Sequence, residues 1–237
     1  MIGREGSKEH SLSREGYVVY ASEPQGGEGP RAALWIAKNM ASSAMVGFMD
    51  RDRAVAMVRT DREELVAVSQ YCDSNLQTIP PDLQRVVDYC QDRRIPLIVG
   101  ADSNAHSTQW GPTQNQRGDE FDAFINQNNL TVLNDGLKPT YYHWVNNSQT
   151  KTYIDITLLN TFAVNKNFGD DWEVMDDETL SDHKMITFKV RATPQAPTPT
   201  RNLKKVDWQL FRADIEGKVI MGRRRLEAMD VHQWAES

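Results

Sequence analysis

A strand–helix–strand pattern in the middle of this 237-residue chain limits the folds open to it. Residues 65–71 are mostly apolar and residues 95–99 form a continuous apolar run, and between them Pro80 and Pro81 open a segment with apolar side chains at positions i, i+3, i+4 and i+7. These side chains are Leu83, Val86, Val87 and Cys90. Proline is favoured in the first turn of a helix, and this spacing defines one buried helical face. Two buried strands joined by a helix predict a layered α/β domain.

Further strands and a second helix are expected on both sides of this unit. Short runs with continuous or alternating apolar residues predict the strands. The expected strands cover residues 17–21, 32–37, 54–58, 153–159 and 185–190. A helix is expected over residues 120–128, because Phe121, Phe124 and Ile125 share one face and the pair of asparagines at its end fits a helix C-cap.

The composition excludes several classes of protein. Apolar residues make up 39% of the chain and charged residues 25%, as in ordinary globular domains. No apolar run is long enough to span a membrane, and the N-terminal segment lacks the apolar core of a secretory signal. Cys72 and Cys90 lie in apolar-periodic stretches, which favours buried free thiols and a reducing compartment. We therefore expect an intracellular protein, nuclear or cytoplasmic, with no membrane partner.

Charge is distributed unevenly along the chain. Residues 191–237 hold nine Lys or Arg and six Asp or Glu, a net charge of +3, whereas residues 1–190 hold 18 basic and 27 acidic residues, a net charge of −9. Such an acidic body is a poor non-specific binder of nucleic acid. It is compatible with a metal-dependent enzyme, because a bound cation offsets the carboxylates of its site.

Two further signals define the C-terminal part of the chain. Residues 191–200 contain three prolines and are expected to form a linker. Beyond them, Asp207 can cap a helix. The run Arg223-Arg224-Arg225 is interpreted as a solvated helix face rather than a nucleic-acid contact.

Polar residues stand at the ends of three apolar runs. Asp102 and Asn104 follow the second buried run, Asp155 lies in the run over 153–159, and Asp182 and His183 come just before the run over 185–190. A carboxylate at the end of a strand is held rigidly and faces solvent or a ligand. Three such ends that converge would make a site for a divalent metal and a phosphate. Asp-Ser-Asn alone is also compatible with a simple turn.

These motifs, in this order, resemble the endonuclease/exonuclease/phosphatase superfamily, in the branch of apurinic-type endonuclease domains of non-LTR retrotransposons. The similar segments are residues 30–36, 68–73, 100–107, 110–111, 115–118, 129–134, 138–140, 154–157, 172–174 and 181–183. A last segment, residues 201–208, resembles the part that leads from this domain toward a reverse transcriptase. The resemblance covers roughly residues 15–210 and implies a four-layer α/β sandwich of the DNase I-like type.

The resemblance also implies a division of the chain. Residues 1–190 are expected to form the endonuclease/exonuclease/phosphatase domain. Residues 201–237 are expected to form a helical tail that leads toward the reverse-transcriptase domain of the parent element.

The implied chemistry is phosphodiester cleavage that depends on Mg²⁺ or Mn²⁺. The residue that matches Asp102 aligns the attacking water or assists the leaving group, and the residue that matches Asn104 donates a hydrogen bond to the phosphate. Tyr71 matches a tyrosine that touches the phosphate, and a buried core tyrosine is the alternative. His106 and Trp110 also fall in matching segments, and structural packing is at least as good an interpretation of them.

The resemblance gives the remaining site residues complementary roles. His183 would contact the scissile phosphate or act as a base, Asp155 would orient it, and Asp182 would reach the metal. We expect Asp102, Asn104 and these three residues to converge at one end of the sheets. An Asp155 carboxylate oxygen should lie within hydrogen-bond reach of His183.

Two features that the resemblance implies have no match in this sequence. The family begins with a strand that ends in Asn and a second strand that ends in Gln-Glu, where the Glu is the principal metal ligand. Residues 17–21 match a strand that follows this Glu in the family, and Glu5, Glu9 and Glu15 do not follow a buried β-run. We therefore expect an N-terminally incomplete domain that lacks its first two strands, with impaired activity.

The expected function is to nick DNA and so prepare a 3′ hydroxyl for target-primed reverse transcription. Its implied partners are DNA and the reverse-transcriptase domain of the parent element. Two alternatives stay open. The absent Glu favours a catalytically dead remnant or an interaction module of the same fold. A phosphoesterase that acts on small phosphates or lipids is disfavoured by the retrotransposon-like segments.

Overall fold

The structure is a computed structural model. It describes residues 16–22, 28–61, 63–76, 79–145, 148–177, 181–193, 195–197, 207, 209–210, 212–213 and 215–216. The chain divides into two compact units, residues 1–197 and 198–237. Within the described residues, no helix is both long and apolar enough to cross a membrane.

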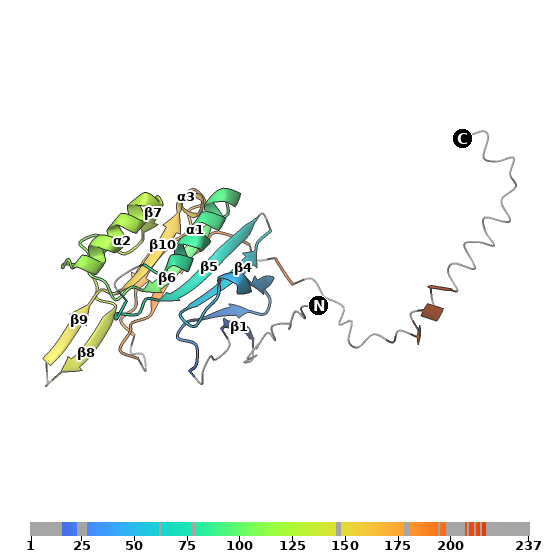
Figure 1. Ribbon diagram of the computed structural model, residues 1–237, viewed down its shortest axis with the longest axis horizontal. Coiled ribbons are helices and arrows are strands. Elements are labelled where there is room, and N and C mark those ends of the chain that lie inside the picture. Colours follow the sequence, from blue (N-terminus) through green and yellow to red (C-terminus); the bar gives the residue numbers. More distant parts are fainter. Residues whose placement is uncertain are drawn as a thin grey trace, which may run out of the picture. The chain divides into compact units, whose positions relative to one another are not determined.

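A six-stranded mixed sheet forms the centre of the first unit, with strand order β3-β4-β5-β6-β10-β7 (Figure 1). The strands are β3 (Ser42–Ala44), β4 (Arg53–Arg59), β5 (Glu64–Tyr71), β6 (Leu97–Asp102), β7 (Leu130–Val132) and β10 (Asp155–Asn160). β5 and β6 are parallel and are joined through helix α1 (Pro81–Arg93), while the other pairs are antiparallel. The predicted strand–helix–strand unit is therefore confirmed.

Helix α1 follows the pattern that predicted it. It begins with proline, and all four predicted apolar side chains on its inner face are fully buried. Each aliphatic side chain buried in this way stabilises the fold by about 1.5–3 kcal/mol. The helix ends where Arg94 takes a left-handed conformation with φ 57° and donates its backbone N–H to carbonyl oxygens of the last turn.

Helix α2 (Gln116–Gln127) lies beside α1 on the same face of the sheet (Figure 1). It begins four residues before the predicted start, because the Asn115 side chain caps it by accepting a hydrogen bond from the backbone N–H of Gly118 at 2.8 Å. Gly118 is necessary there, since a Cβ atom would overlap the carbonyl oxygen of His106. Asn128 is the C-terminal cap.

The central sheet is buried on both faces, as the alternation along β4 shows. Val55 and Met57 belong to the core that α1 and α2 cover. Ala56 and Val58 point to the opposite face and pack with Ile36 of β2 (Ala33–Ala37). Because successive side chains of a strand alternate between the faces of a sheet, a continuous apolar run identifies a strand that is covered on both sides.

Two small antiparallel sheets line the face opposite the helices. One pairs β1 (Tyr17–Ala21) with β2, and the other pairs β11 (Asp170–Val174) with β12 (Ile186–Lys189). A cavity of about 1290 Å³ is lined by β2, β12 and strands β5, β6 and β10 of the central sheet. Its lining is mostly apolar, but Tyr71, Asp102, Asp155 and His183 also border it.

The hairpin of β8 (Tyr141–Val145) and β9 (Ser148–Thr152) extends from the site end of the central sheet (Figure 1). An isolated bridge pairs Tyr141 with His183, and the N–H of Tyr142 donates to the carbonyl oxygen of Asp182 at 2.8 Å. Trp144 is 65% exposed. Neither this hairpin nor the short elements η1 (Val46–Phe48) and α3 (Thr161–Val164) is anticipated by apolar periodicity.

Several residues of the expected linker are bonded to the first unit. The carbonyl oxygen of Thr193 accepts from the N–H of Asp61 at 2.9 Å, and the backbone of Gln195 pairs with Ala41 and Arg59 at 2.7 and 3.0 Å. Residues 191–197 thus fall in the first unit.

In the second unit, the described residues 209–210, 212–213 and 215–216 are helical. The Asp207 carboxylate accepts hydrogen bonds from the N–H groups of Gln209 and Leu210, both at 3.0 Å, as predicted for a helix cap. The arginine run over 223–225 and the rest of the expected tail lie outside the described residues.

Candidate active site

Three neighbouring strands bring polar side chains together at one edge of the central sheet. Tyr71 and Asp102 are the last residues of the parallel strands β5 and β6, and they stand opposite each other in register. Asp155 is the first residue of the antiparallel strand β10 and stands opposite Asp102. The carboxyl ends of parallel strands meet at one sheet edge, and an antiparallel neighbour begins there. The end of β6 at Asp102 makes this carboxylate part of the strand rather than of the following loop.

His183 completes the arrangement from the loop before β12. Its Nδ1 lies 3.0 and 3.1 Å from the two carboxylate oxygens of Asp155, which is the contact expected from the sequence. The hydrogen bond to Asp155 and the negative charges of Asp155, Asp102 and Asp182 raise the pKa of His183, although burial opposes them. The Tyr141 ring packs edge-on against the imidazole, with 4.7 Å between ring centroids.

Asp102, Asp155 and His183 could together hold a metal ion. One candidate ligand atom from each residue lies within 4.8 Å of the others. Burial raises the pKa of Asp102 to about 6, and repulsion by the negative charge of Asp155 adds to this rise. A divalent cation would relieve this repulsion, and carboxylate oxygens suit Mg²⁺ and Mn²⁺. The residues present therefore fit such a cation.

Asn104 and Asp182 stand at the margin of this group. Asn104 has a left-handed conformation with φ 47°, and its side-chain amide donates to the carbonyl oxygen of Cys72 at 3.1 Å. The Asp182 side chain is 59% exposed, and its carboxylate lies 3.4 Å from Nδ1 of His143 in the β8–β9 hairpin. Asp182 is not one of the three grouped ligands, so the metal contact expected of it stays a prediction.

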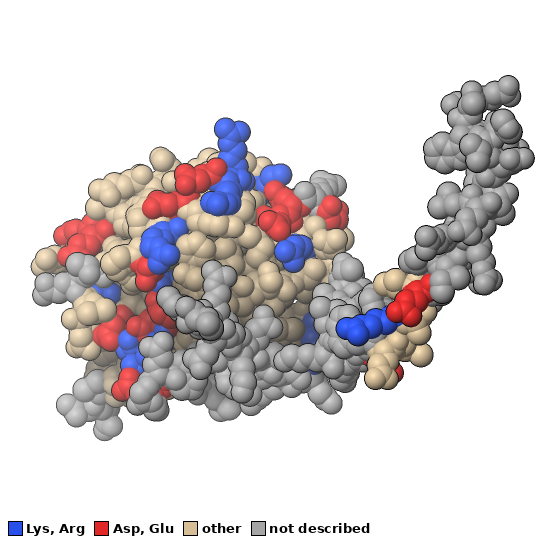
Figure 2. Space-filling model, turned by 45° about the vertical axis from the view of Figure 1, so that its right-hand side comes forward, with Lys and Arg blue, Asp and Glu red and all other residues tan. Residues whose placement is uncertain are grey.

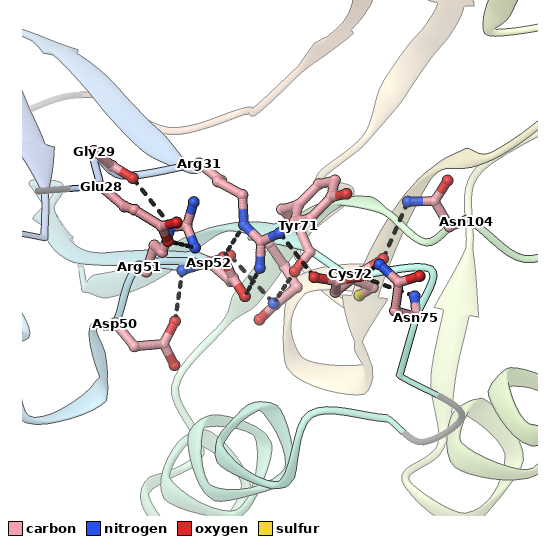
Figure 3. Close-up of polar contacts among 12 residues, drawn as sticks. Glu28, Gly29, Arg31, Asp50, Arg51, Asp52, Tyr71, Cys72, Asn75 and Asn104 are labelled. Atoms are coloured by element: carbon pink, nitrogen blue, oxygen red, sulfur yellow. Dashed lines mark hydrogen bonds and ion pairs between the residues drawn. The ribbon is translucent and has the colours of Figure 1, made fainter. Parts of the chain in front are cut away.

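Tyr71 is packed against Arg31, a residue that the sequence did not single out for the site. The Arg31 guanidinium lies 4.5 Å from the centre of the Tyr71 ring and is bonded to Asp52 and Asp73 (Figure 3). Arg31 falls in a segment that resembles the family, but its two partners lie 21 and 42 residues away in the chain. Only the folded chain shows this contact.

The other residues singled out near the site have structural contacts. Trp110 is 1% exposed and packs edge-on against Phe121 at 6.4 Å, while Nδ1 of His106 lies 2.9 Å from the hydroxyl oxygen of Thr113. Cys72 and Cys90 are buried free thiols, as predicted, and burial raises the pKa of each to about 12. A thiol with such a pKa is not a nucleophile at neutral pH.

Sequence comparison shows that the chain is similar to retrotransposon proteins. Residues 65–187 match the model of the endonuclease-reverse transcriptase family. The chain is 27% identical over 144 residues to a 115 kDa protein in the type-1 retrotransposable element R1DM of Drosophila melanogaster. It is 24% identical over 191 residues to the retrovirus-related Pol polyprotein of the type-1 retrotransposable element R1 of Bradysia coprophila. These alignments cover 54% and 71% of this chain, but only 14% and 18% of the two relatives.

Comparison with solved structures supports the expected fold. The endonuclease domain of TRAS1, a telomere-specific non-LTR retrotransposon, is 26% identical, with a TM-score of 0.67 over 75% of this chain and 81% of that domain. The catalytic domain of APE2 from Xenopus laevis shares the fold at 14% identity, with a TM-score of 0.57 over 79% of each chain. The predicted α/β fold of the DNase I-like type is confirmed.

Proposed function

Because the chain belongs to the endonuclease-reverse transcriptase family, we propose that its first unit cleaves phosphodiester bonds in DNA with the help of a divalent cation. One observation carries this proposal. Asp102, Asp155 and His183 form a compact group at the edge of the central sheet, beside Tyr71 and a large cavity. Two carboxylates and an oriented imidazole are the groups needed to bind a cation and to contact a phosphate.

Each side chain of the group has a role that follows from its surroundings. Asp155 accepts the Nδ1 proton of His183 and so fixes the orientation of the ring. In its protonated form, His183 can donate a hydrogen bond to a phosphate oxygen. Asp102, in its ionised form, can align an attacking water or assist the leaving group. When bound, the cation would be held by Asp102 and Asp155 and would stabilise negative charge on the phosphate.

Asn104, Tyr71 and Asp182 are proposed to complete the phosphate site. Tyr71 borders the same cavity as Asp102 and can bring its hydroxyl to a phosphate oxygen. Asn104 follows Asp102 by two residues in the loop after β6, and Asp182 precedes His183. Mg²⁺ is usually held by one or two carboxylates and keeps several waters. The Glu that is the principal metal ligand in the family has no match in this sequence, so we expect Mg²⁺ to bind weakly and nicking to be slow.

We propose DNA as the substrate, with the β8–β9 hairpin as the surface that contacts it. On the face shown in Figure 2, Lys and Arg side chains of the described residues are interspersed with Asp and Glu. The β8–β9 hairpin instead offers aromatic rings, with Trp144 exposed and Tyr142 flanked by Lys151 and Lys184 at 5.7 and 5.6 Å. The exposed Trp144 ring can stack on a base, and the two lysines beside the half-buried Tyr142 ring can contact phosphates. We propose that the nick provides the 3′ hydroxyl for reverse transcription by the parent element.

A plasmid-nicking assay tests the proposal. Supercoiled plasmid incubated with the protein and Mg²⁺ should be converted slowly to the open-circular form, and Asp102→Asn or His183→Ala should reduce the rate by about 100-fold or more. Asp92→Asn is the matched control, because Asp92 lies on α1 and is exposed. A folded protein that binds DNA but does not nick it with either Mg²⁺ or Mn²⁺ would instead be an interaction module of the same fold.

A further inference from the structure

Arg31 is built into the margin of the site by three charged hydrogen bonds. Its Nε and Nη2 donate to the two carboxylate oxygens of Asp52 at 2.5 and 2.6 Å, and its Nη1 donates to Asp73 at 2.8 Å. A planar guanidinium matches a carboxylate in this bidentate way, whereas an ammonium group does not. All three nitrogen atoms of the guanidinium are thus engaged within the protein.

These carboxylates make Arg31 a poor direct ligand for phosphate. Hydrogen bonding to Asp52 and Asp73 raises the pKa of Arg31, and its charge is opposed by two negative charges. A phosphate group would have to displace a carboxylate and would meet the other one. The flat face of the guanidinium instead packs over the ring of Tyr71, 4.5 Å from the ring centre.

The supports of Arg31 are themselves tied to Tyr71. The carbonyl oxygen of Asp52 accepts from the backbone N–H of Tyr71 at 2.7 Å, so one residue holds both the strand end and the guanidinium above the ring. Asp73 follows Tyr71 by two residues, and the backbone N–H of Asn75 and then Arg31 lower its pKa to about 2. The ring therefore has a fixed neighbour that is anchored by Asp52 and by Asp73, just beyond the end of the ring's own strand (Figure 3).

We propose that Arg31 is a positioning residue that holds the Tyr71 ring at the edge of the cavity, with its hydroxyl presented to the phosphate. This inference rests on the proposed function, because it assigns the phosphate contact to Tyr71. Arg31, Tyr71 and Asp102 line the same cavity, and Tyr71 stands opposite Asp102 in register. A displaced ring would weaken contact with the reacting phosphate more than it would weaken the binding of DNA as a whole.

Ring signals test the positioning without any need for activity. The chain has seven tyrosines, and ring ¹³C labelling with Tyr71→Phe identifies the signal of Tyr71. Arg31→Met should move this signal toward the shift of a solvent-exposed tyrosine. Arg31→Lys should move it in the same way, because an ammonium group cannot make the bidentate contact with Asp52. Arg51→Met is the control, because Arg51 is a neighbouring arginine paired with Glu28. A Tyr71 signal that is unchanged in Arg31→Met would overturn the inference.

Nicking kinetics test the consequence. Arg31→Met and Tyr71→Phe should each lower kcat by about 10-fold with little change in KM, and the double variant should lose no more than the worse single variant. Multiplicative losses, or full rescue by Arg31→Lys, would contradict action through Tyr71. Thermal melting of each variant separates a local effect from loss of folding. If the wild-type chain does not nick DNA, the proposed function fails, and the ring signals alone decide the role of Arg31.

Discussion

Asp102 is the residue at which the demands of folding and of the proposed chemistry differ most clearly. Burial and the neighbouring Asp155 raise its pKa to about 6, above the value of an unfolded aspartate. The protonated form of Asp102 is therefore the one that suits the folded protein. Its contribution to stability is complete at pH values below the pKa of Asp102 in the unfolded chain, and it is lost as the pH rises through about 6. At neutral pH, without a cation, the folded protein carries the unfavourable ionised form.

Replacement of this carboxylate should consequently stabilise the metal-free protein. We expect Asp102→Asn to raise the free energy of unfolding at pH 7 by about 1 kcal/mol, a value reduced from the full pKa shift because the group is partly exposed. Nicking should be lost in the same variant. Urea unfolding at pH 7 and pH 4 measures the effect, which should vanish at pH 4. Lower stability of the variant at pH 7 would contradict the raised pKa.

His183 has the opposite charge and a related dependence on Asp155. Its pKa is raised chiefly by the hydrogen bond to Asp155, so its contribution to stability is complete below the unfolded pKa and is lost as the pH rises through the higher folded value. In the metal-free protein, NMR titration of the His183 ring should give a midpoint above 6.5, the ordinary value. Asp155→Asn should lower this midpoint. An equal midpoint in both proteins would show that the pair does not form in solution.

At the scale of elements, periodicity predicts what is buried and little else. Strands β4 and β5 and helix α1 are foreseen because their apolar side chains are covered on one or both faces. The half-buried three-residue strand β3 and the largely exposed β8–β9 hairpin are not foreseen, since neither leaves an apolar alternation in the sequence. Family resemblance, by contrast, indicates the residues of the site, because their order along the chain is distinctive.

The same limit applies to side chains in loops. The contact between Asp155 and His183 is foreseen from the family resemblance, which pairs a residue in one apolar run with a residue just before another. The Asp182 carboxylate instead lies near His143 of the hairpin, and Arg31 bonds to carboxylates far away in the chain. Such directions depend on contacts between distant segments, which the sequence around each residue does not encode.

The β8–β9 hairpin provides a prediction about DNA affinity. Trp144→Ala should weaken binding of a DNA duplex by about 5- to 100-fold, because an exposed ring that stacks on a base contributes about 1–3 kcal/mol. The folded site should be preserved, since Trp144 is exposed and lies outside the bridge between Tyr141 and His183. Fluorescence anisotropy with labelled duplex measures the change. Leu137→Ala is the control, because Leu137 is 78% exposed but lies before the hairpin. Equal affinity of both variants would remove the hairpin from the proposed DNA surface.

At the scale of the whole molecule, the chain divides after residue 197 into two compact units, and we expect the first to fold on its own. The first unit contains the central sheet and the candidate active site, and residues 191–197 belong to it. Ala192 packs with the cluster around Leu65 and Phe168, and Thr193 and Gln195 are hydrogen-bonded to the sheet end. Residues 191–193 and 195–197 thus run along the first unit up to the division.

Two deletions test where the folding unit ends. Removal of residues 198–237 should leave the cooperative thermal transition and its midpoint nearly unchanged, because the described contacts of the first unit are retained. Removal of residues 191–237 should lower Tm by roughly 6–12 °C, because three backbone hydrogen bonds are lost. This deletion breaks the backbone hydrogen bonds of Thr193 and Gln195, each worth about 1 kcal/mol, in a unit of a size at which 1 kcal/mol shifts Tm by about 2–4 °C. Differential scanning calorimetry distinguishes the two chains. If the shorter deletion already abolishes the transition, the second unit contributes to the core and the division at residue 197 is wrong; if both chains melt like the full chain, the segment 191–197 is a linker after all.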